Sequence, residues 1–380
     1  MRIVVAPDSF KESMTSMEAA QAMTRGITRV APEAQIDQAP MADGGEGTMS
    51  VLATAMNAET RHAMVRSALG TPIQAPYSMT ADGCAIIDIA SVVGLGLTPA
   101  QDRDIMMSST SGVGDVVRAA LDAGATRLLI GLGGSATNDG GAGLFAALGA
   151  SLLDGSGADV TPTPTGLARV SRVDLSGLDP RLATVRIEAA CDVTNPLLGP
   201  NGATAIFAPQ KGGTAVTLPL METAMARWAQ ALTSACGRDC RETPGAGAAG
   251  GLGYALLMLG GVTRSGVDVV IEATGLEKRI AAADLVMTGE GSLDGQTASG
   301  KAPWGIAQVA HRHRVPVLAF AGRVLGGEDN YDAVLPIASG PVDLATALKD
   351  GPTNLENTVV HAMRLMRVGG ALTRRGDRNW

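Results

Sequence analysis

The chain has 380 residues, of which 46% are hydrophobic and 18% charged, and its formal net charge is −7. A chain of this size can bury a large core and usually forms more than one domain, so we expect two. The acidic balance provides no basic field for nucleic acid or an anionic membrane surface, and neither is expected as a partner. A small acidic metabolite stays compatible with this charge, because lysines and backbone N–H groups can bind an anion locally.

The N-terminus carries no recognisable targeting segment. Its short apolar run is followed by Pro7 and Asp8, which fits neither a signal peptide nor a transit peptide. The uncharged stretch 243–263 contains seven glycines and makes a poor membrane helix. These features predict a cytoplasmic protein without a transmembrane segment, and none of them sets its oligomeric state.

The two ends of the chain show the pattern of a parallel sheet. Residues 2–6 and 35–39 are predicted strands, and Thr15 with Glu18 forms a capping box for the helix between them. Late in the chain, helical stretches separate three short apolar runs, at 284–288, 315–320 and 333–337. Two early and three late strands predict a five-stranded doubly wound α/β sheet.

The middle of the chain has a different pattern. Residues 64–89 are typical of antiparallel strands, with turns at 70–72 and 82–83. We therefore expect a second α/β domain over residues 59–275, inserted into a discontinuous domain made of residues 1–58 and 276–380.

Charged side chains follow three of the predicted strands. Ligands of open parallel sheets bind beyond the carboxyl ends of the strands. Carboxylates there are hard oxygen ligands suited to Mg²⁺, and lysines can balance the charge of a transferring phosphoryl group. We predict metal ligands at Asp43, Glu46, Glu290 and Asp294, catalytic lysines at Lys11 and Lys301, and substrate contacts at Asp8 and Ser9. The alternative is that both lysines lie on solvated helix starts.

Three glycine-rich loops add capacity to bind an anion. They cover residues 131–143, which follow a predicted strand, residues 244–253, and residues 209–213, which contain Lys211. Glycines let backbone N–H groups approach phosphate oxygens. We predict nucleotide contacts from Gly133, Gly134, Ser135, Asn138, Gly250 and Gly251, and a substrate contact from Lys211. The glycines would otherwise only permit tight turns or close packing. The Walker A pattern is absent, so ATP would bind through another architecture.

Asp192 is our candidate for the group that orients and deprotonates the substrate hydroxyl. It follows the apolar strand 185–190 and precedes the turn at Asn195 and Pro196. A carboxylate that accepts the hydroxyl proton is a recurring part of phosphoryl-transfer sites. The alternative is an aspartate that caps the turn at Thr194 and Asn195.

Five sequence blocks carry a resemblance to a known family. They are residues 6–11 (APDSFK), 42–48 (ADGGEGT), 133–143 (GGSATNDGGAG), 191–197 (CDVTNPL) and 288–294 (TGEGSLD). With these blocks the chain resembles the bacterial glycerate kinase family, of the glycerate 2-kinase type, over almost its whole length. One departure is Ser111, where relatives often carry tyrosine.

The resemblance implies both a fold and a reaction. The fold is a flavodoxin-like domain carrying an inserted α/β domain, with the active site in the cleft between them. The reaction is phosphorylation of a hydroxyl of D-glycerate by ATP with Mg²⁺, in organic acid catabolism. The 2-hydroxyl is favoured over the 3-hydroxyl, although the sequence does not separate the two.

Two other classes of function were weighed. Gly131, Gly133 and Ala136 match the GxGxxA fingerprint of dinucleotide-dependent dehydrogenases, with Asp154 as the acidic residue. Against it stand Asn138 inside the loop and the clustered carboxylates, which hydride transfer does not need. A non-catalytic regulator that binds a metabolite would share the clefts but would not need those carboxylates.

Overall fold

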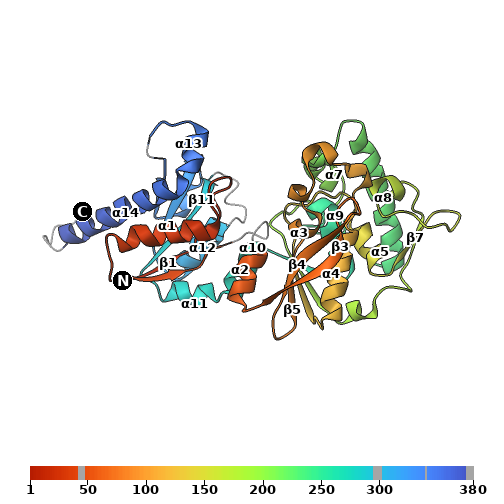
Figure 1. Cartoon of the computed structure of the whole chain (residues 1–380), viewed down its shortest axis with the longest axis horizontal. Helices are drawn as coiled ribbons and strands as arrows, with labels where there is room; N and C mark the ends of the chain where they lie inside the picture. The colour runs from red at the N-terminus through yellow and green to blue at the C-terminus, as the bar shows by residue number, and fades with distance from the viewer. Residues whose placement is uncertain (42–47, 294–301, 339, 374–380) are drawn as a thin grey trace. The chain divides into compact units, whose positions relative to one another are not determined.

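The computed structural model describes residues 1–41, 48–293, 302–338 and 340–373. The chain divides into two compact units, Met1–Asp43 with Val267–Trp380 and Gly44–Gly266, which we call the first and the second unit (Figure 1). The second unit is therefore inserted into the first.

The first unit is built on a five-stranded parallel sheet. Its strands lie in the order β13-β12-β11-β1-β2, and every neighbouring pair is parallel. This is the flavodoxin-like order, with the reversal of strand order between β1 and β11. The predicted fold class is confirmed. The strands are β1 (Arg2–Val5), β2 (Gln35–Gln38), β11 (Leu285–Leu293), β12 (Val317–Val324) and β13 (Ala333–Pro336).

Helices cover both faces of this sheet. On one face, α1 (Ser16–Thr28) and α14 (Gly351–Thr373) lie side by side, and their apolar residues join one core cluster with Ile3 and Val5 (Figure 1). The capping box predicted for Thr15 and Glu18 starts α1. The contacts of α12 (Ala302–Arg312) with β11 and β12 lie outside that cluster, so α12 covers the opposite face. The shorter helices are α10 (Gly266–Ala273), α11 (Leu276–Ala281) and α13 (Leu344–Lys349).

The second unit contains a mixed six-stranded sheet in the order β10-β9-β6-β5-β4-β3. The pairs β3–β4 and β4–β5 are antiparallel, as predicted for residues 64–89, and the rest of the sheet is parallel. The strands are β3 (Glu59–Arg66), β4 (Pro72–Met79), β5 (Cys84–Asp88), β6 (Arg127–Gly131), β9 (Arg186–Ala190) and β10 (Val262–Arg264), with a separate pair, β7 (Ser151–Leu153) and β8 (Arg172–Asp174).

The helices of the second unit pack around one large core. Within this core the rings of Trp228 and Phe145 pack edge to face, with 5.8 Å between the ring centroids. The helices are α2 (Thr48–Ala55), α3 (Ala90–Val93), α4 (Ser111–Asp122), α5 (Ala142–Ala147), α6 (Pro164–Leu167), α7 (Ala203–Phe207), α8 (Thr217–Cys236) and α9 (Ala248–Met258).

The division of the chain lies earlier than the boundaries expected after residues 58 and 275. Helix α2 contacts β4 and β5, so it belongs with the second unit. In α10, Val267 packs closely over Gly305 of α12, which ties α10 to the first unit. The assignments of α2 and α10 both depend on packing against residues far away in the sequence.

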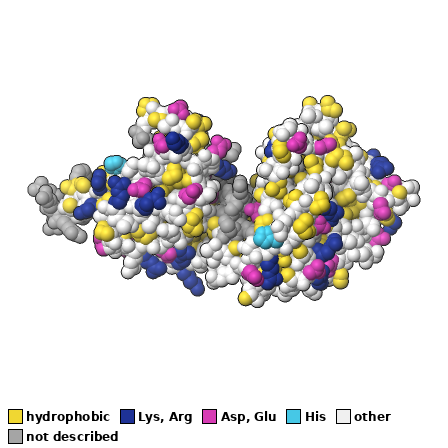
Figure 2. Space-filling model, in the orientation of Figure 1, with side chains coloured by type: hydrophobic (Ala, Val, Ile, Leu, Met, Phe, Trp, Pro, Cys, Tyr) yellow, Lys and Arg dark blue, Asp and Glu magenta, His cyan; other side chains and the backbone are white. Residues whose placement is uncertain are grey.

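The surface carries charges of both signs. On the face shown in Figure 2, acidic side chains lie among the basic ones over both units. Within the described ranges, no helix combines the length and the apolar character needed to cross a membrane.

Candidate active site

The loop between β6 and α5 combines an exposed turn with a buried base. Gly134 is exposed and has a φ of +68°, a conformation that glycine adopts without strain. Gly133 is partly exposed, whereas residues 135–139 are buried. The loop therefore presents backbone at its tip, as the prediction for an anion-binding loop requires.

Lys211 lies beneath this loop, at the end of the short helix Pro209–Lys211. It is 2% exposed, and its Nζ donates to the Ser135 Oγ and to the Thr137 carbonyl, both at 2.8 Å. Burial lowers the pKa of Lys211 to about 7, although the charge of Asp139 opposes the shift. Lys211 and Ser135, two of the residues predicted to contact ligands, are thus joined by a hydrogen bond.

Asp139 anchors the other end of the loop and was not predicted as a site residue. Its fully buried carboxylate accepts hydrogen bonds from the N–H and hydroxyl of Thr110 at 2.7 and 2.9 Å, and from the N–H groups of Gly141 and Gly143. Burial raises the pKa of Asp139, and these hydrogen bonds oppose the rise. No local sequence pattern identifies it, because its partner Thr110 lies 29 positions away in the chain.

Asn138 attaches the loop to helix α7. Its Nδ2 donates to the Thr204 Oγ1 of α7 at 3.1 Å. The Asn138 Oδ1 and the Thr137 Oγ1 are buried and have no hydrogen-bond partner among the described residues. Because buried polar atoms are normally paired, these two oxygens could accept from a water or a ligand.

Gly250 and Gly251 lie behind the loop rather than at its tip. A Cβ on Gly250 would lie 2.0 Å from the Thr137 carbonyl oxygen, and a Cβ on Gly251 would lie 2.7 Å from the Cα of Gly140. Both glycines are buried. The structure thus gives them the close-packing role that the sequence also allowed, in which they hold the loop in place.

Asp192 follows β9, as expected, and is partly buried. Its Oδ1 accepts a hydrogen bond of 3.0 Å from the backbone N–H of Gly266, the first residue of α10. This bond differs from the cap expected at Thr194 and Asn195. It places the carboxylate where the chain leaves the second unit.

In the first unit, Asp8, Ser9 and Lys11 follow β1. Asp8 is buried, its N–H donates to the Gly289 carbonyl at 2.8 Å, and its Oδ1 accepts from the Ser9 N–H at 2.6 Å. A Cβ on Gly291 would lie 3.2 Å from the backbone nitrogen of Lys11, so this loop runs close along the end of β11. Lys11 itself is exposed. These residues lie where the strand order reverses, as predicted.

Glu290 lies at the same edge and is 5% exposed. Burial, and to a smaller extent the charge of Glu290, raise the pKa of Tyr331, a neighbour that the sequence did not reveal. The other predicted metal ligands, Asp43, Glu46 and Asp294, and the predicted catalytic Lys301 lie outside the described residues. Within the described part of the chain, no three His, Cys, Asp or Glu residues gather as a metal site would need.

The geometry argues against a dehydrogenase. Asp154, the acidic residue of that alternative, is exposed and accepts hydrogen bonds from Ser156 and Ala158 in a local turn. It follows β7, which pairs with β8 and is not part of the sheet that holds β6. In a dinucleotide site the acidic residue belongs to the same βαβ unit as the glycine loop.

Comparisons with known proteins give one consistent result. The model of the glycerate kinase family matches residues 3–367. The chain is 45% identical to a glycerate kinase of Bacillus subtilis (strain 168), over 94% of this chain and 96% of that one. It is 44% identical to a glycerate 2-kinase of Escherichia coli (strain K12), over 93% and 95%.

A solved structure extends this similarity to the fold. The crystal structure of a candidate glycerate kinase 2 from Salmonella typhimurium LT2 matches with a TM-score of 0.87 at 41% identity, over 98% of this chain and 99% of that one. The resemblance inferred from the five sequence blocks is confirmed, and the protein is an enzyme. The chain belongs to the glycerate kinase family.

Proposed function

We propose that this enzyme transfers the γ-phosphoryl group of ATP to a hydroxyl of D-glycerate, with 2-phosphoglycerate favoured over 3-phosphoglycerate as the product. The observation that carries the proposal is the similarity over nearly the full length of both chains to an enzyme named glycerate 2-kinase. The partly exposed Gly133 and the exposed Gly134, close to a buried lysine, support the use of a phosphate donor. We further propose a cytoplasmic enzyme of organic acid catabolism.

Phosphoryl transfer depends mainly on positioning and charge compensation. In the proposed reaction a glycerate oxygen bonds to the γ-phosphorus, the bond from that phosphorus to the bridging oxygen of ADP breaks, and the hydroxyl proton passes to Asp192. The N–H groups of Gly133 and Gly134 and the hydroxyl of Ser135 hold the phosphates, while Asn138, Gly250 and Gly251 keep the loop in shape. Ser135 can still donate its own proton, because Lys211 uses it only as an acceptor.

The first unit supplies charge in this proposal. Lys11 and Lys301 balance the negative charge of the phosphoryl group, and Asp8 and Ser9 contact glycerate. The donor set Asp43, Glu46, Glu290 and Asp294 has the hard oxygen atoms that Mg²⁺ prefers, and the buried Glu290 fits such a role. When bound, Mg²⁺ would neutralise phosphate charge.

Phosphorus NMR tests the proposal directly. The protein is mixed with ATP, MgCl₂ and D-glycerate, and the spectrum is compared with added 2-phosphoglycerate and 3-phosphoglycerate. We expect ADP and one phosphomonoester signal that coincides with 2-phosphoglycerate. A signal at 3-phosphoglycerate would correct the position of transfer, and ADP formation that does not depend on glycerate would reject the substrate. A protein that binds glycerate without forming ADP would be a regulator.

A further inference from the structure

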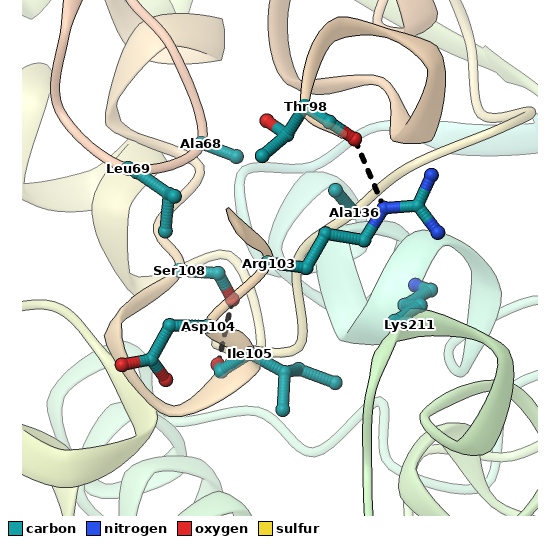
Figure 3. A pocket seen from close by; sticks show the side chains of 9 residues that line it. All are labelled: Ala68, Leu69, Thr98, Arg103, Asp104, Ile105, Ser108, Ala136 and Lys211. Carbon is teal, nitrogen blue, oxygen red and sulfur yellow. Dashed lines mark hydrogen bonds between the residues drawn. The ribbon is translucent and has the colours of Figure 1, made fainter. Parts of the chain in front are cut away.

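A small pocket lies in the second unit beside the glycine-rich loop (Figure 3). Its walls include Ala68, Leu69, Arg103, Ile105, Ala136 and Lys211. Its cavity volume is about 10 Å³, and it opens to solvent. A cavity of this size has room for about one water-sized group, so its enclosed part can take one polar group of a ligand while the rest of the ligand extends toward solvent.

Two cationic side chains, those of Arg103 and Lys211, line this pocket, and both donate hydrogen bonds to uncharged groups. Arg103 donates from Nε to the Thr98 carbonyl at 3.1 Å and from Nη2 to the Leu95 carbonyl at 2.9 Å. Lys211 is held by Ser135 and Thr137, as described above. Neither cation forms an ion pair with another described residue.

Both cations keep donors for a ligand. A guanidinium has five N–H groups and an ammonium has three, and the bonds above use two of each. Asp104 also lines the pocket, but its carboxylate accepts from the Met106 N–H and points away from the two cationic groups in Figure 3. Arg103 therefore makes the polar end of the pocket positive, and Lys211 adds a second charge when it holds its proton.

We propose that this pocket binds the carboxylate of a small organic acid, with Arg103 and Lys211 as its donors. The proposal rests on the proposed function, since it identifies that acid as glycerate. The planar fork of an arginine matches the two oxygens of a carboxylate. The apolar walls from Leu69, Ile105 and Ala136 suit the carbon atoms of the acid.

The position along the loop supports this assignment. Ala136 lies two residues after Gly134, and two residues span at most about 7 Å. A three-carbon acid held here by its carboxylate has its hydroxyl groups near the loop proposed for the ATP phosphates. A phosphate group is the other anion that two such cations suit, so the test must separate it from a carboxylate.

Calorimetry with a charged ligand and its neutral analogue tests the pocket whether or not the protein is active. Dissociation constants of D-glycerate, its amide glyceramide, and ATP are measured for the wild type and for Arg103→Met. Charge-assisted hydrogen bonds are worth about 10- to 100-fold in affinity. We expect Arg103→Met to weaken D-glycerate by that factor and glyceramide by less than about threefold, with ATP unchanged. Arg103→Lys should recover part of the loss.

Two further variants separate recognition from folding. Leu69→Glu adds a negative charge at an exposed lining position, where the side chain is 37% exposed, and should weaken D-glycerate but not glyceramide. Arg227→Met removes an exposed arginine of α8 as the matched control, and should change none of the three constants.

The outcomes separate the two proposals. Equal weakening of D-glycerate and glyceramide by Arg103→Met, with no effect of Leu69→Glu, would overturn the pocket as a carboxylate site. Weakened ATP with unchanged D-glycerate would make it a phosphate site instead. If the wild type binds D-glycerate through Arg103 but forms no phosphoglycerate, the pocket stands and the proposed reaction fails.

Discussion

Two acidic side chains close together in the chain, Glu188 and Asp192, have contrasting surroundings. Glu188 lies within β9 with no exposed side-chain surface, and three arginines contact it. Arg127 and Arg186 approach its Oε1 at 2.9 Å, and Arg264 approaches its Oε2 at 3.1 Å. Asp192 lies beyond the end of the same strand, is partly buried, and accepts from the backbone N–H of Gly266.

Glu188 also contrasts with Lys211, which lies beneath the glycine-rich loop. Burial raises the pKa of Glu188, but the hydrogen bonds from Arg127 and Arg264 outweigh it, and the net shift is downward. Lys211 instead has neutral hydrogen-bond partners, and its pKa falls to about 7. Charge inside the sheet is thus fixed by dedicated counter-charges, whereas charge beyond the strand ends stays responsive to a ligand or to pH. The following predictions test this division.

The largest expected effect comes from Asp192→Asn. If Asp192 accepts the hydroxyl proton, the variant should lose about 10²- to 10⁴-fold in kcat, the usual contribution of a positioned base. ATP affinity and melting temperature should stay close to wild type, since the amide oxygen can still accept from Gly266. Steady-state kinetics and thermal melting measure both. Normal turnover in a variant that melts much earlier would make Asp192 a structural cap.

Glu188→Gln should give the opposite result, a loss of stability without a loss of chemistry. Removing one partner of a buried ion pair typically costs about 3 to 5 kcal/mol. We expect about 2 to 3 kcal/mol here, because the arginines still reach water. Urea denaturation measures it, with Glu59→Gln in the exposed pair with Arg61 as a control that should change nothing. Unchanged stability of Glu188→Gln, or a reduced kcat of the folded variant, would contradict the distinction between a structural Glu188 and a catalytic Asp192.

Much of the first unit could be predicted from its sequence. The predicted strands at 2–6, 35–39, 284–288, 315–320 and 333–337 correspond to all five strands, although β11 and β12 continue to residues 293 and 324. The Thr15–Glu18 capping box identified the start of α1. Local signals suffice there because each βαβ element repeats one pattern. The boundaries could not be predicted, since α2 and α10 join their units through contacts with residues distant in sequence.

The site was predictable only in part. Glycine spacing identified the loop, and the glycine-rich segment 209–213 identified Lys211, but their contact joins residues 76 positions apart and no local pattern reveals it. The same holds for Asp139, whose partners include Thr110 on another segment. Arg103 was missed because its segment carries no motif. For Gly250 and Gly251, only the packing distances decide between contact with a ligand and support of the loop.

A smaller effect is expected at the tip of the loop. Gly134→Val places a side chain where backbone N–H groups are proposed to approach phosphate, and should weaken ATP binding by about tenfold or more, the loss of one charge-assisted contact. Gly124→Val is the matched control, because Gly124 also has a positive φ, +90°, and no atom lies within 4 Å of its added Cβ. Calorimetric titration with ATP separates them. Equal affinity in both variants would exclude the loop from nucleotide binding.

The smallest expected effect is a dependence of stability on pH. The pKa of Lys211 is about 7 in the folded protein, against an ordinary value of 10.5. Between these values the unfolded chain binds a proton that the folded protein does not bind, so the free energy of unfolding rises with pH across this window. Below about pH 7 both states are protonated and the slope from this group disappears. Asp139, the charged neighbour of Lys211, has its pKa raised by burial and would contribute a slope of the opposite sign.

The difference in unfolding free energy between the wild type and Lys211→Met isolates the contribution of this lysine to the pH dependence of stability. Their difference in unfolding free energy should change by up to about 1.4 kcal/mol for each pH unit between 7.5 and 9, in favour of the wild type as pH rises. Lys278→Met, at an exposed position of α11, should give a constant difference from the wild type. Glu188→Gln should also give a constant difference, because the pKa of Glu188 is lowered and its linked stability changes only in acid. Urea denaturation at several pH values measures all four proteins. Parallel curves for the wild type and Lys211→Met would show that Lys211 keeps its proton on folding, and that its charge is fixed as firmly as that of Glu188.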